Sequence, residues 1–135
     1  MQLSCTPEET QFREEVRAWL RANVPRSKRP RTGLALRDYD LAWQRRQYEG
    51  GWAGISWPRE YGGRGLSLTQ QVIWYEECAA AHAPVGGSTF VGLSHAGPTL
   101  IVGGTEAQER VHLPTILQGG AVRCQGFAGP NAGPG

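Results

Sequence analysis

Residues 51–70 read GWAGISWPREYGGRGLSLTQ, and this stretch decides how the chain is organised. Glycines stand where a backbone must turn tightly and aromatic residues lie between them, which predicts a loop. The loop is predicted to end at Ser67, because Gln70 follows this serine by three positions. Such a pair forms a reciprocal capping box, and it predicts a helix over 68–81.

The first helix of the chain has the same kind of start. Glu9 follows Thr6 at capping-box spacing, and Pro7 occupies the first helical position, where its missing N–H costs nothing. We expect this helix to end near Val24, because the residue before a proline disfavours the helical region.

A second helix is predicted over 38–49, with Leu41, Arg45 and Tyr48 on one side and a glycine pair closing it. The stretch before it, 26–37, is basic and is interrupted by proline and glycine. It could contact nucleic acid or an anionic ligand. The near-neutral charge of the whole chain favours a solvated loop instead.

After the aromatic loop the chain continues as helices. The 68–81 helix carries apolar residues on more than one face, which predicts burial on several sides. A short helix is expected over 98–102. A third capping box, in residues 105–108, predicts a helix interrupted at Pro114.

Residues 121–127 change to a period of two, since Val122 and Cys124 alternate with Arg123 and Gln125. This pattern predicts a strand over Ala121–Phe127. The strand has no partner within this sequence, so we expect something else to pair with it.

Composition limits the class of protein. The chain has 135 residues with 19 Gly and 9 Pro, which predicts one domain or part of one. The chain has fourteen basic and twelve acidic residues, and this near balance argues against a nucleic-acid binder. The sequence contains no apolar run of about 20 residues, so no membrane span is predicted. Three scattered cysteines without a visible secretory signal predict a cytoplasmic protein with reduced thiols, whose cysteines act as small core residues.

No catalytic constellation can be assembled from the residues alone. The histidines have no metal-ligand spacing, so no metal site is predicted. Glu76 and Glu77 could be acid–base groups, but a solvated helix face is the simpler interpretation. The Gly62–Gly65 stretch lacks the neighbours of a phosphate-binding loop and is interpreted as a turn.

Five segments together resemble one family. Residues 57–67, WPREYGGRGLS, look like the W-P-x-E-Y-G-G-x-G loop of flavin-dependent acyl-CoA dehydrogenases. Four further segments resemble that family in the same order: Gly97–Leu100 (GPTL), Gly104–Gln108 (GTEAQ), Leu113–Gly119 (LPTILQG) and Cys124–Phe127 (CQGF).

The resemblance implies an all-α fold: a helical N-terminal domain over residues 1–120, plus one unpaired terminal strand. Residues 121–135 would be the truncated start of the middle β-domain. In the family, FAD lies between the β-domain and a C-terminal helical domain, and it takes the β-hydride of an acyl-CoA thioester after a carboxylate removes the α-proton. Phe90 and Leu93 are the expected lining of the acyl pocket.

The resemblance weakens at the flavin-binding turn. Family members carry a hydroxyl residue, Glu, Ser and Asp where this sequence has Ala128, Gly129, Pro134 and Gly135. Only Gln125, Gly126 and Phe127 stay as candidate flavin contacts by analogy. The family's catalytic carboxylate comes from the C-terminal region, so no catalytic residue is assigned here. We therefore expect the isolated chain neither to retain FAD nor to turn over acyl-CoA.

A second hypothesis belongs to the non-enzyme class. The chain would be a non-catalytic partner subunit that docks on a complete acyl-CoA dehydrogenase and contributes its unpaired strand. Family members form homo-oligomers or pair unlike subunits, so the resemblance is compatible with either assembly.

Overall fold

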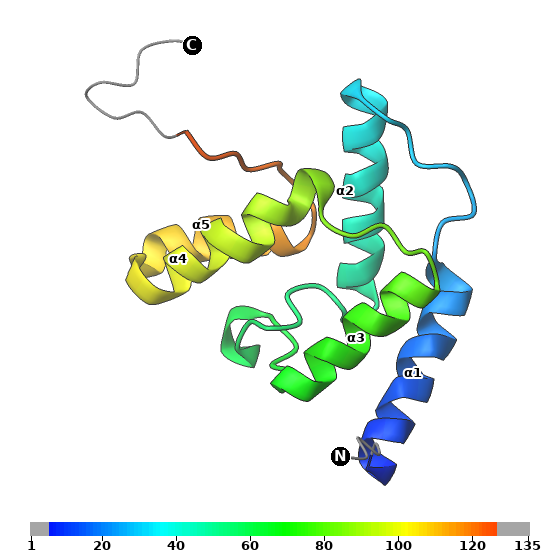
Figure 1. The fold of residues 1–135 in the computed structure, drawn as a ribbon. Coiled ribbons are helices and arrows are strands. Elements are labelled where there is room, and N and C mark those ends of the chain that lie inside the picture. The colour runs from blue at the N-terminus through cyan, green and yellow to red at the C-terminus, as the bar shows by residue number, and fades with distance from the viewer. Residues whose placement is uncertain (1–5, 127–135) are drawn as a thin grey trace, which may run out of the picture.

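The computed structural model describes residues 6–126 of the chain, and these residues form helices joined by loops, with no strand among them (Figure 1). The α-helices and shorter helical turns follow in this order: α1 (Pro7–Asn23), α2 (Gly33–Glu49), η1 (Arg59–Tyr61), α3 (Leu68–Ala80), η2 (Gly87–Thr89), η3 (Gly92–Ala96), α4 (Gly97–Gly103) and α5 (Glu106–Leu117). The all-α prediction is confirmed.

The three predicted capping boxes are all formed, at the starts of α1, α3 and α5. At α1 the Thr6 hydroxyl accepts from the Glu9 N–H at 3.2 Å, and the Glu9 carboxylate accepts from the Thr6 N–H at 2.8 Å. The helix ends at Asn23, and Val24 is extended before the proline, as predicted. Local sequence therefore fixes where these helices begin.

The start of α2 was predicted five residues too late. The helix begins at Gly33 rather than 38, because the residues after Pro30 and Gly33 are good helix formers with nothing to interrupt them. The side that carries Leu41, Arg45 and Tyr48 is not the buried one. Asp40, Trp43 and Gln44 are buried, whereas Arg45 and Tyr48 are exposed.

The predicted interruption of α5 at Pro114 is wrong. The helix continues through Pro114 to Leu117. Pro114 is itself exposed, while its neighbours Leu113 and Ile116 are buried. Packing of these apolar side chains keeps the helix intact although the proline lacks an N–H for the helical ladder.

Helix α3 buries one face rather than several. Ile73, Trp74 and Cys78 are buried, but Val72 and Tyr75 are 55% and 53% exposed. Among residues 6–126, the apolar residues on the second face of α3 are thus only about half covered. The helical stretch before α4 is longer than predicted, because the π-helical turn η3 runs directly into it.

The predicted terminal strand has no regular secondary structure over residues 121–126, and Phe127 lies outside the described residues. A single extended segment has no neighbour to receive its backbone hydrogen bonds, so it cannot form a ladder by itself. The prediction of a strand is therefore wrong over residues 121–126.

Two hydrophobic clusters hold the helices together. In the first, α1 and α3 lie side by side and Phe12, Val16 and Leu20 of α1 pack with buried tryptophans from α2, α3 and the aromatic loop (Figure 1). The second joins Trp57 to buried residues of α5, with partly buried side chains of η3 and α4 packed against them. The aromatic loop supplies Trp52 to the first cluster and Trp57 to the second, so it links the two.

Among the helices of residues 6–126, none combines the length and apolar character that a membrane span requires.

Candidate functional site

A cavity of about 430 Å³ lies where α2, the aromatic loop and α3 meet the segment before η3. Its lining comes from α2 (Asp40, Trp43, Gln44, Gln47), the aromatic loop (Trp52 to Trp57), α3 (Trp74, Tyr75) and the later segment (Pro84, Val85, Gly86, Thr89, Phe90, Leu93, Ser94). Phe90 and Leu93, the two residues that the sequence singled out for an acyl pocket, are both in this lining.

The aromatic side of the cavity is built by the aromatic loop over residues 51–67. Backbone hydrogen bonds from Arg64 to Gly54 (3.1 Å) and from Leu66 to Ile55 (2.8 Å) fold this loop back on itself. The fold places the Trp52 indole flat against Trp74 of α3, with ring centroids 4.7 Å apart and planes 9° from parallel. These stacked rings form a rigid apolar wall.

Two further tryptophans, Trp43 of α2 and Trp57 of the loop, attach these elements to the opposite segment through their indole N–H groups. The Trp43 Nε1 donates to the Pro84 carbonyl at 2.9 Å, and the Trp57 Nε1 donates to the Leu93 carbonyl at 2.9 Å. Both tryptophans are buried, so each ring finds a partner for its polar group. Their apolar faces are thereby left to line the cavity.

Besides Trp43, helix α2 contributes polar residues to the lining. Asp40, Gln44 and Gln47 recur at helical spacing and line the same cavity. Gln44 is 2% exposed and donates from Nε2 to the Leu117 carbonyl at 2.9 Å, which ties α2 to the end of α5. The cavity therefore has aromatic rings of the loop and α3 on one side and residues of α2 on the other.

In the Gly62–Gly65 stretch, Gly62 and Gly65 have positive φ values of 85° and 62°, as a tight turn requires. The Arg64 guanidinium lies over the Trp52 ring at 3.7 Å from its centroid and donates to the Gly51 carbonyl at 3.1 Å. The guanidinium therefore makes a cation–π contact with Trp52, one of the two stacked rings of the aromatic wall.

Gln125, one of the three predicted flavin contacts, lies at a second hollow. This hollow of about 390 Å³ is also lined by His95, His112 and Arg123, and the Nδ1 of His95 is buried without a hydrogen-bond partner. Gln125 and Gly126 are exposed. Gly126 is not part of this lining, and Phe127 lies outside the described residues.

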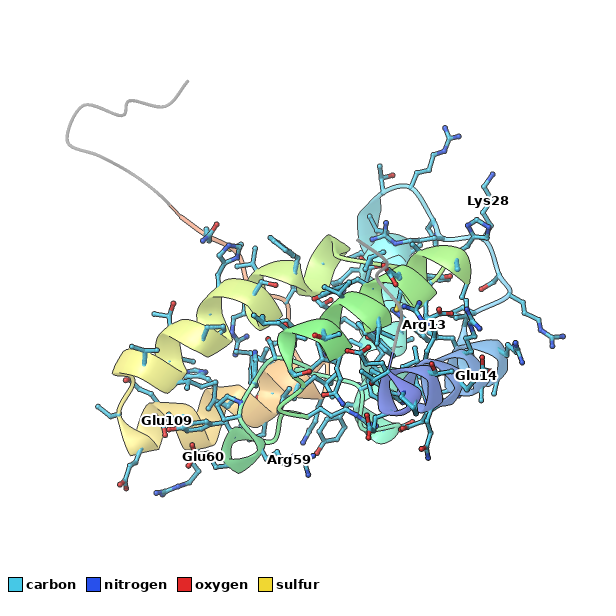
Figure 2. All side chains as sticks on the ribbon, turned by 60° about the horizontal axis from the view of Figure 1, so that its bottom comes forward. Arg13, Glu14, Lys28, Arg59, Glu60 and Glu109 are labelled. Atoms are coloured by element: carbon cyan, nitrogen blue, oxygen red, sulfur yellow. The ribbon has the colours of Figure 1, made fainter. Side chains whose placement is uncertain are left out.

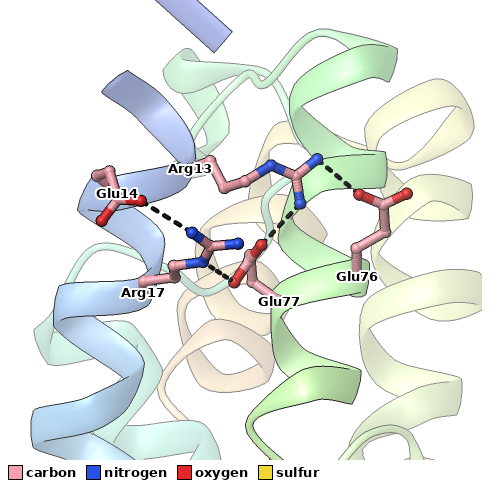
Figure 3. Close-up of polar contacts among 5 residues, drawn as sticks. All are labelled: Arg13, Glu14, Arg17, Glu76 and Glu77. Carbon is pink, nitrogen blue, oxygen red and sulfur yellow. Dashed lines mark hydrogen bonds and ion pairs between the residues drawn. The ribbon is translucent and has the colours of Figure 1, made fainter. Parts of the chain in front are cut away.

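The sequence suggested that both adjacent glutamates of α3 lie on a solvated helix face, and this is wrong for Glu77. Glu76 is exposed, but Glu77 is buried and accepts from Arg13 and Arg17 of α1 at 2.7 Å each (Figure 3). Burial works to raise the pKa of Glu77, but the hydrogen bonds and charges of Arg17 and Arg13 outweigh it and lower the pKa. This ionised group joins two helices and does not line either hollow.

The cysteines divide between two environments. Cys78 is buried, as predicted, and burial with the nearby Glu77 raises the pKa of its thiol to about 12. Cys124 is exposed, so the prediction of a core residue is wrong there, and Cys5 lies outside the described residues. No cluster of potential metal ligands occurs in residues 6–126.

Most residues that line the cavity were not predicted from the sequence. Its tryptophans were interpreted only as core or loop residues, and the polar residues of α2 were not singled out. The spacing of Asp40, Gln44 and Gln47 was the available signal, because polar residues one helical turn apart share a face. Only the packing of α2 shows that this face is turned inward.

Comparison with known proteins gives one consistent result. The family described as "Acyl-CoA dehydrogenase, N-terminal domain" matches residues 6–120. Acyl-CoA dehydrogenase IpdE1 of Mycolicibacterium smegmatis is 40% identical over 130 residues, covering 91% of this chain and 33% of the relative. Acyl-CoA dehydrogenase FadE26 of Mycobacterium tuberculosis is 31% identical over 138 residues, covering 98% of this chain and 34% of the relative.

Solved structures agree with these relatives. The ChsE4–ChsE5 complex from Mycobacterium tuberculosis superposes with a TM-score of 0.72 at 29% identity, over 98% of this chain and 33% of that one. The Tcur3481–Tcur3483 steroid ACAD gives a TM-score of 0.72 at 33% identity, over 98% of this chain and 34% of that one. The chain spans about a third of the length of the relatives it matches.

Proposed function

The chain belongs to the acyl-CoA dehydrogenase family as its N-terminal helical domain, and from that premise we propose that it forms the helical wall of an acyl pocket. The reaction served would be the FAD-dependent α,β-dehydrogenation of an acyl-CoA thioester. The observation that carries this proposal is the 430 Å³ cavity, which Phe90 and Leu93 line together with four tryptophans. Its size is in the range of small-molecule sites, about 300–1,000 Å³.

We further propose an acyl group that carries fused rings. One similar structure is titled a steroid ACAD, and the stacked Trp52–Trp74 pair gives this cavity a flat, rigid apolar wall. Flat ring systems gain contact with such a wall at little conformational cost, whereas a flexible alkyl chain loses rotational freedom.

The proposal gives the chain a binding role and no catalytic residue. FAD, when bound, supplies the hydride acceptor of the reaction. Gln125, Gly126 and Phe127 remain the candidates for contact with it, in a segment (121–135) that we propose to be the start of the β-domain after a helical domain over 1–120.

Binding can be tested on the 135-residue chain by following its tryptophan fluorescence during titration. The probes are decalin-propionyl-CoA, octanoyl-CoA and free CoA. We expect the ring thioester to bind most tightly and free CoA to change the indole emission least. Equal responses to all three would contradict the proposal, because the acyl group would then add nothing.

Variants locate the site. Phe90→Ala removes a ring from the lining and is expected to weaken decalin-propionyl-CoA binding by about tenfold, since burying a large apolar side chain contributes roughly 1.5–3 kcal/mol. Val102→Ala is the matched control, because Val102 is 89% exposed and lies outside the cavity lining. A loss in the control equal to that in Phe90→Ala would exclude the cavity as the binding site.

Retention of FAD is tested separately. The chain is mixed with FAD, desalted and examined for flavin absorption. We expect no stoichiometric flavin, because the turn that should bind it lacks the polar residues of the family. A 1:1 flavin band that survives desalting would overturn the expectation that the isolated chain does not retain FAD.

A second function, a non-catalytic subunit, is favoured by one comparison: a similar structure is the ChsE4–ChsE5 complex. Under this alternative, the chain docks on a complete acyl-CoA dehydrogenase through residues 121–127. Co-expression with a complete dehydrogenase from the same cell, followed by light scattering, tests it. A well-folded chain that stays monomeric in that mixture would count against the alternative.

A further inference from the structure

Arg29 occupies a different environment from the rest of the basic 26–37 stretch. Its guanidinium donates from Nε and Nη2 to the two carboxylate oxygens of Asp40, at 2.7 Å each. The Asp40 side chain is 3% exposed. Lys28, one residue earlier, points away from the body of the molecule (Figure 2). The expectation that this stretch is a solvated loop is therefore wrong at Arg29.

The Asp40 carboxylate also holds the edge of the cavity. It accepts a third hydrogen bond, from the Ser88 N–H at 2.9 Å. We name residues 84–90 the rim segment, because Pro84, Val85, Gly86, Thr89 and Phe90 from it line the cavity. One carboxylate thus joins the loop before α2, helix α2 itself and the rim segment.

The rim segment is attached at both ends to the same face of α2. Trp43 holds Pro84 through its indole N–H, and Asp40, one helical turn earlier, holds Ser88. Between them the backbone comes so close that a Cβ on Gly87 would overlap the Arg29 guanidinium and the Asp40 carboxylate. Gly87 also has a φ of +71°, which favours glycine. The local sequence is therefore adapted to this contact.

Asp40 needs Arg29 to stay ionised where it is. Burial works to raise the pKa of Asp40, but the hydrogen bonds from Arg29 and Ser88 and the Arg29 charge lower it. Without the guanidinium, a buried carboxylate would be left with an uncompensated charge, and it would move toward water or take up a proton. Either change loosens its hold on the Ser88 amide.

We propose that Arg29 is a positioning residue for the cavity: its ion pair with Asp40 holds the rim segment against α2 and so sets the width of the space between the rim and the aromatic wall. Arg29 does not line the cavity and would act only through Asp40 and Ser88. The effect on ligands rests on the proposed function, since it assumes that the cavity takes an acyl group.

The test compares Arg29→Gln, Arg29→Lys and Lys28→Gln in the full chain. Arg29→Gln and Lys28→Gln remove the same charge from adjacent residues, but only the first removes the ion pair. The first readout is NMR of the Trp43 indole N–H and the Ser88 amide N–H. We expect both signals to move in Arg29→Gln, to move less in Arg29→Lys, and to stay in place in Lys28→Gln.

The second readout is binding of decalin-propionyl-CoA and octanoyl-CoA. We expect Arg29→Gln to weaken binding of the ring thioester about tenfold, because a rim segment that is no longer held in place must be ordered when the ligand binds. Octanoyl-CoA should be affected less, because a flexible chain adapts to a wider space. Arg29→Lys should recover part of the loss, since a lysine keeps the charge but not the two-pronged geometry.

Unchanged Trp43 and Ser88 signals in Arg29→Gln would overturn the proposal, as would equal changes in Lys28→Gln. Moved signals with unaltered binding of both thioesters would also overturn it, because the ion pair would then be merely structural. If neither thioester binds the unaltered chain, the proposed function fails, while the NMR signals still decide whether Arg29 holds the rim. If Arg29→Gln does not fold, Arg29→Lys is judged by the same signals.

Discussion

Glu77 is the residue whose charge matters most to the packing of α1 against α3. Its side chain is 6% exposed and accepts hydrogen bonds from Arg13 and Arg17 at 2.7 Å. We expect Glu77→Gln to lower the free energy of unfolding by about 2 kcal/mol, because hydrogen bonds to charged groups contribute about 1.5–3 kcal/mol. Urea denaturation followed by circular dichroism measures this loss.

The neighbouring glutamate is the matched control. Glu76 also binds Arg13 at 2.7 Å, but its side chain is 55% exposed (Figure 3). Exposed ion pairs contribute about 0–1 kcal/mol, so Glu76→Gln should cost less than 1 kcal/mol. Similar losses in the two variants would show that burial of Glu77 does not decide the strength of the interaction.

The same residue, together with Asp40, predicts how acid affects stability. Both carboxyls have a lowered pKa in the folded chain, so the unfolded chain binds protons more readily than the folded one. Their stabilisation is complete above their unfolded pKa values, about 4, and is lost as pH falls through the folded pKa values. Urea midpoints should therefore be steady from pH 7 to 5 and fall below that.

The pH dependence has an internal check. Glu77→Gln removes one of the two carboxyls and should reduce the fall of the urea midpoint between pH 5 and 3. If the variant and the unaltered chain lose stability with the same slope, the folded pKa of Glu77 is not lowered.

At the level of single residues, sequence reasoning could not separate Glu76 from Glu77. They are identical and adjacent, and either could face solvent. The direction of each side chain depends on which face of α3 meets α1, and that is settled by apolar residues elsewhere on both helices. Arg29 and Lys28 also differ through tertiary contacts, because Arg29 alone of the two is paired with Asp40 of α2 among the described residues.

Helix α4 can pack closely against Trp57 because its first residue, Gly97, has no side chain. A Cβ on Gly97 would overlap the ring of Trp57, whereas Gly103, at the other end of α4, has nothing within 4 Å. We expect Gly97→Ala to cost about 1–3 kcal/mol by forcing α4 away from the indole. Gly103→Ala should be neutral or slightly stabilising, because alanine favours a helix.

Urea denaturation of the two alanine variants checks this contact, and the indole N–H of Trp57, which donates to the Leu93 carbonyl, reports on it locally. An unchanged Trp57 signal in Gly97→Ala would mean that α4 does not pack as closely as described.

Elements were predictable where their signals are local. The three capping boxes gave correct starts for α1, α3 and α5, because each involves only four consecutive residues. Pro114 shows the opposite case. Its local preference is to interrupt a helix, but burial of Leu113 and Ile116 in the second cluster outweighs that preference. Such packing cannot be seen from the sequence around the proline.

For the molecule as a whole, the unequal size of the two clusters predicts unequal local stability. The cluster around α1 and α3 contains eleven buried residues, whereas the one around Trp57 and α5 contains five. Regions with less buried apolar surface open at lower free energy. We expect backbone amides of α5 to exchange with deuterium at a lower opening free energy than those of α1 and α3.

Native-state hydrogen exchange in low urea measures these free energies. A single value shared by α1, α3 and α5 would show that the two clusters unfold together, with the aromatic loop coupling them. The cytoplasmic location predicted from the cysteines stays a prediction.

By itself, the sequence determined the all-α fold, most helix starts and the family. Capping pairs, helical periods and family motifs each depend on residues that are close together in the chain, so they can be recognised without the tertiary structure. It also picked out Phe90 and Leu93. Only the tertiary structure decided that these two residues share a cavity with four tryptophans and the polar face of α2. It also decided that Arg29 reaches the edge of that cavity through Asp40. These contacts join residues far apart in the chain, and their geometry depends on how whole helices pack.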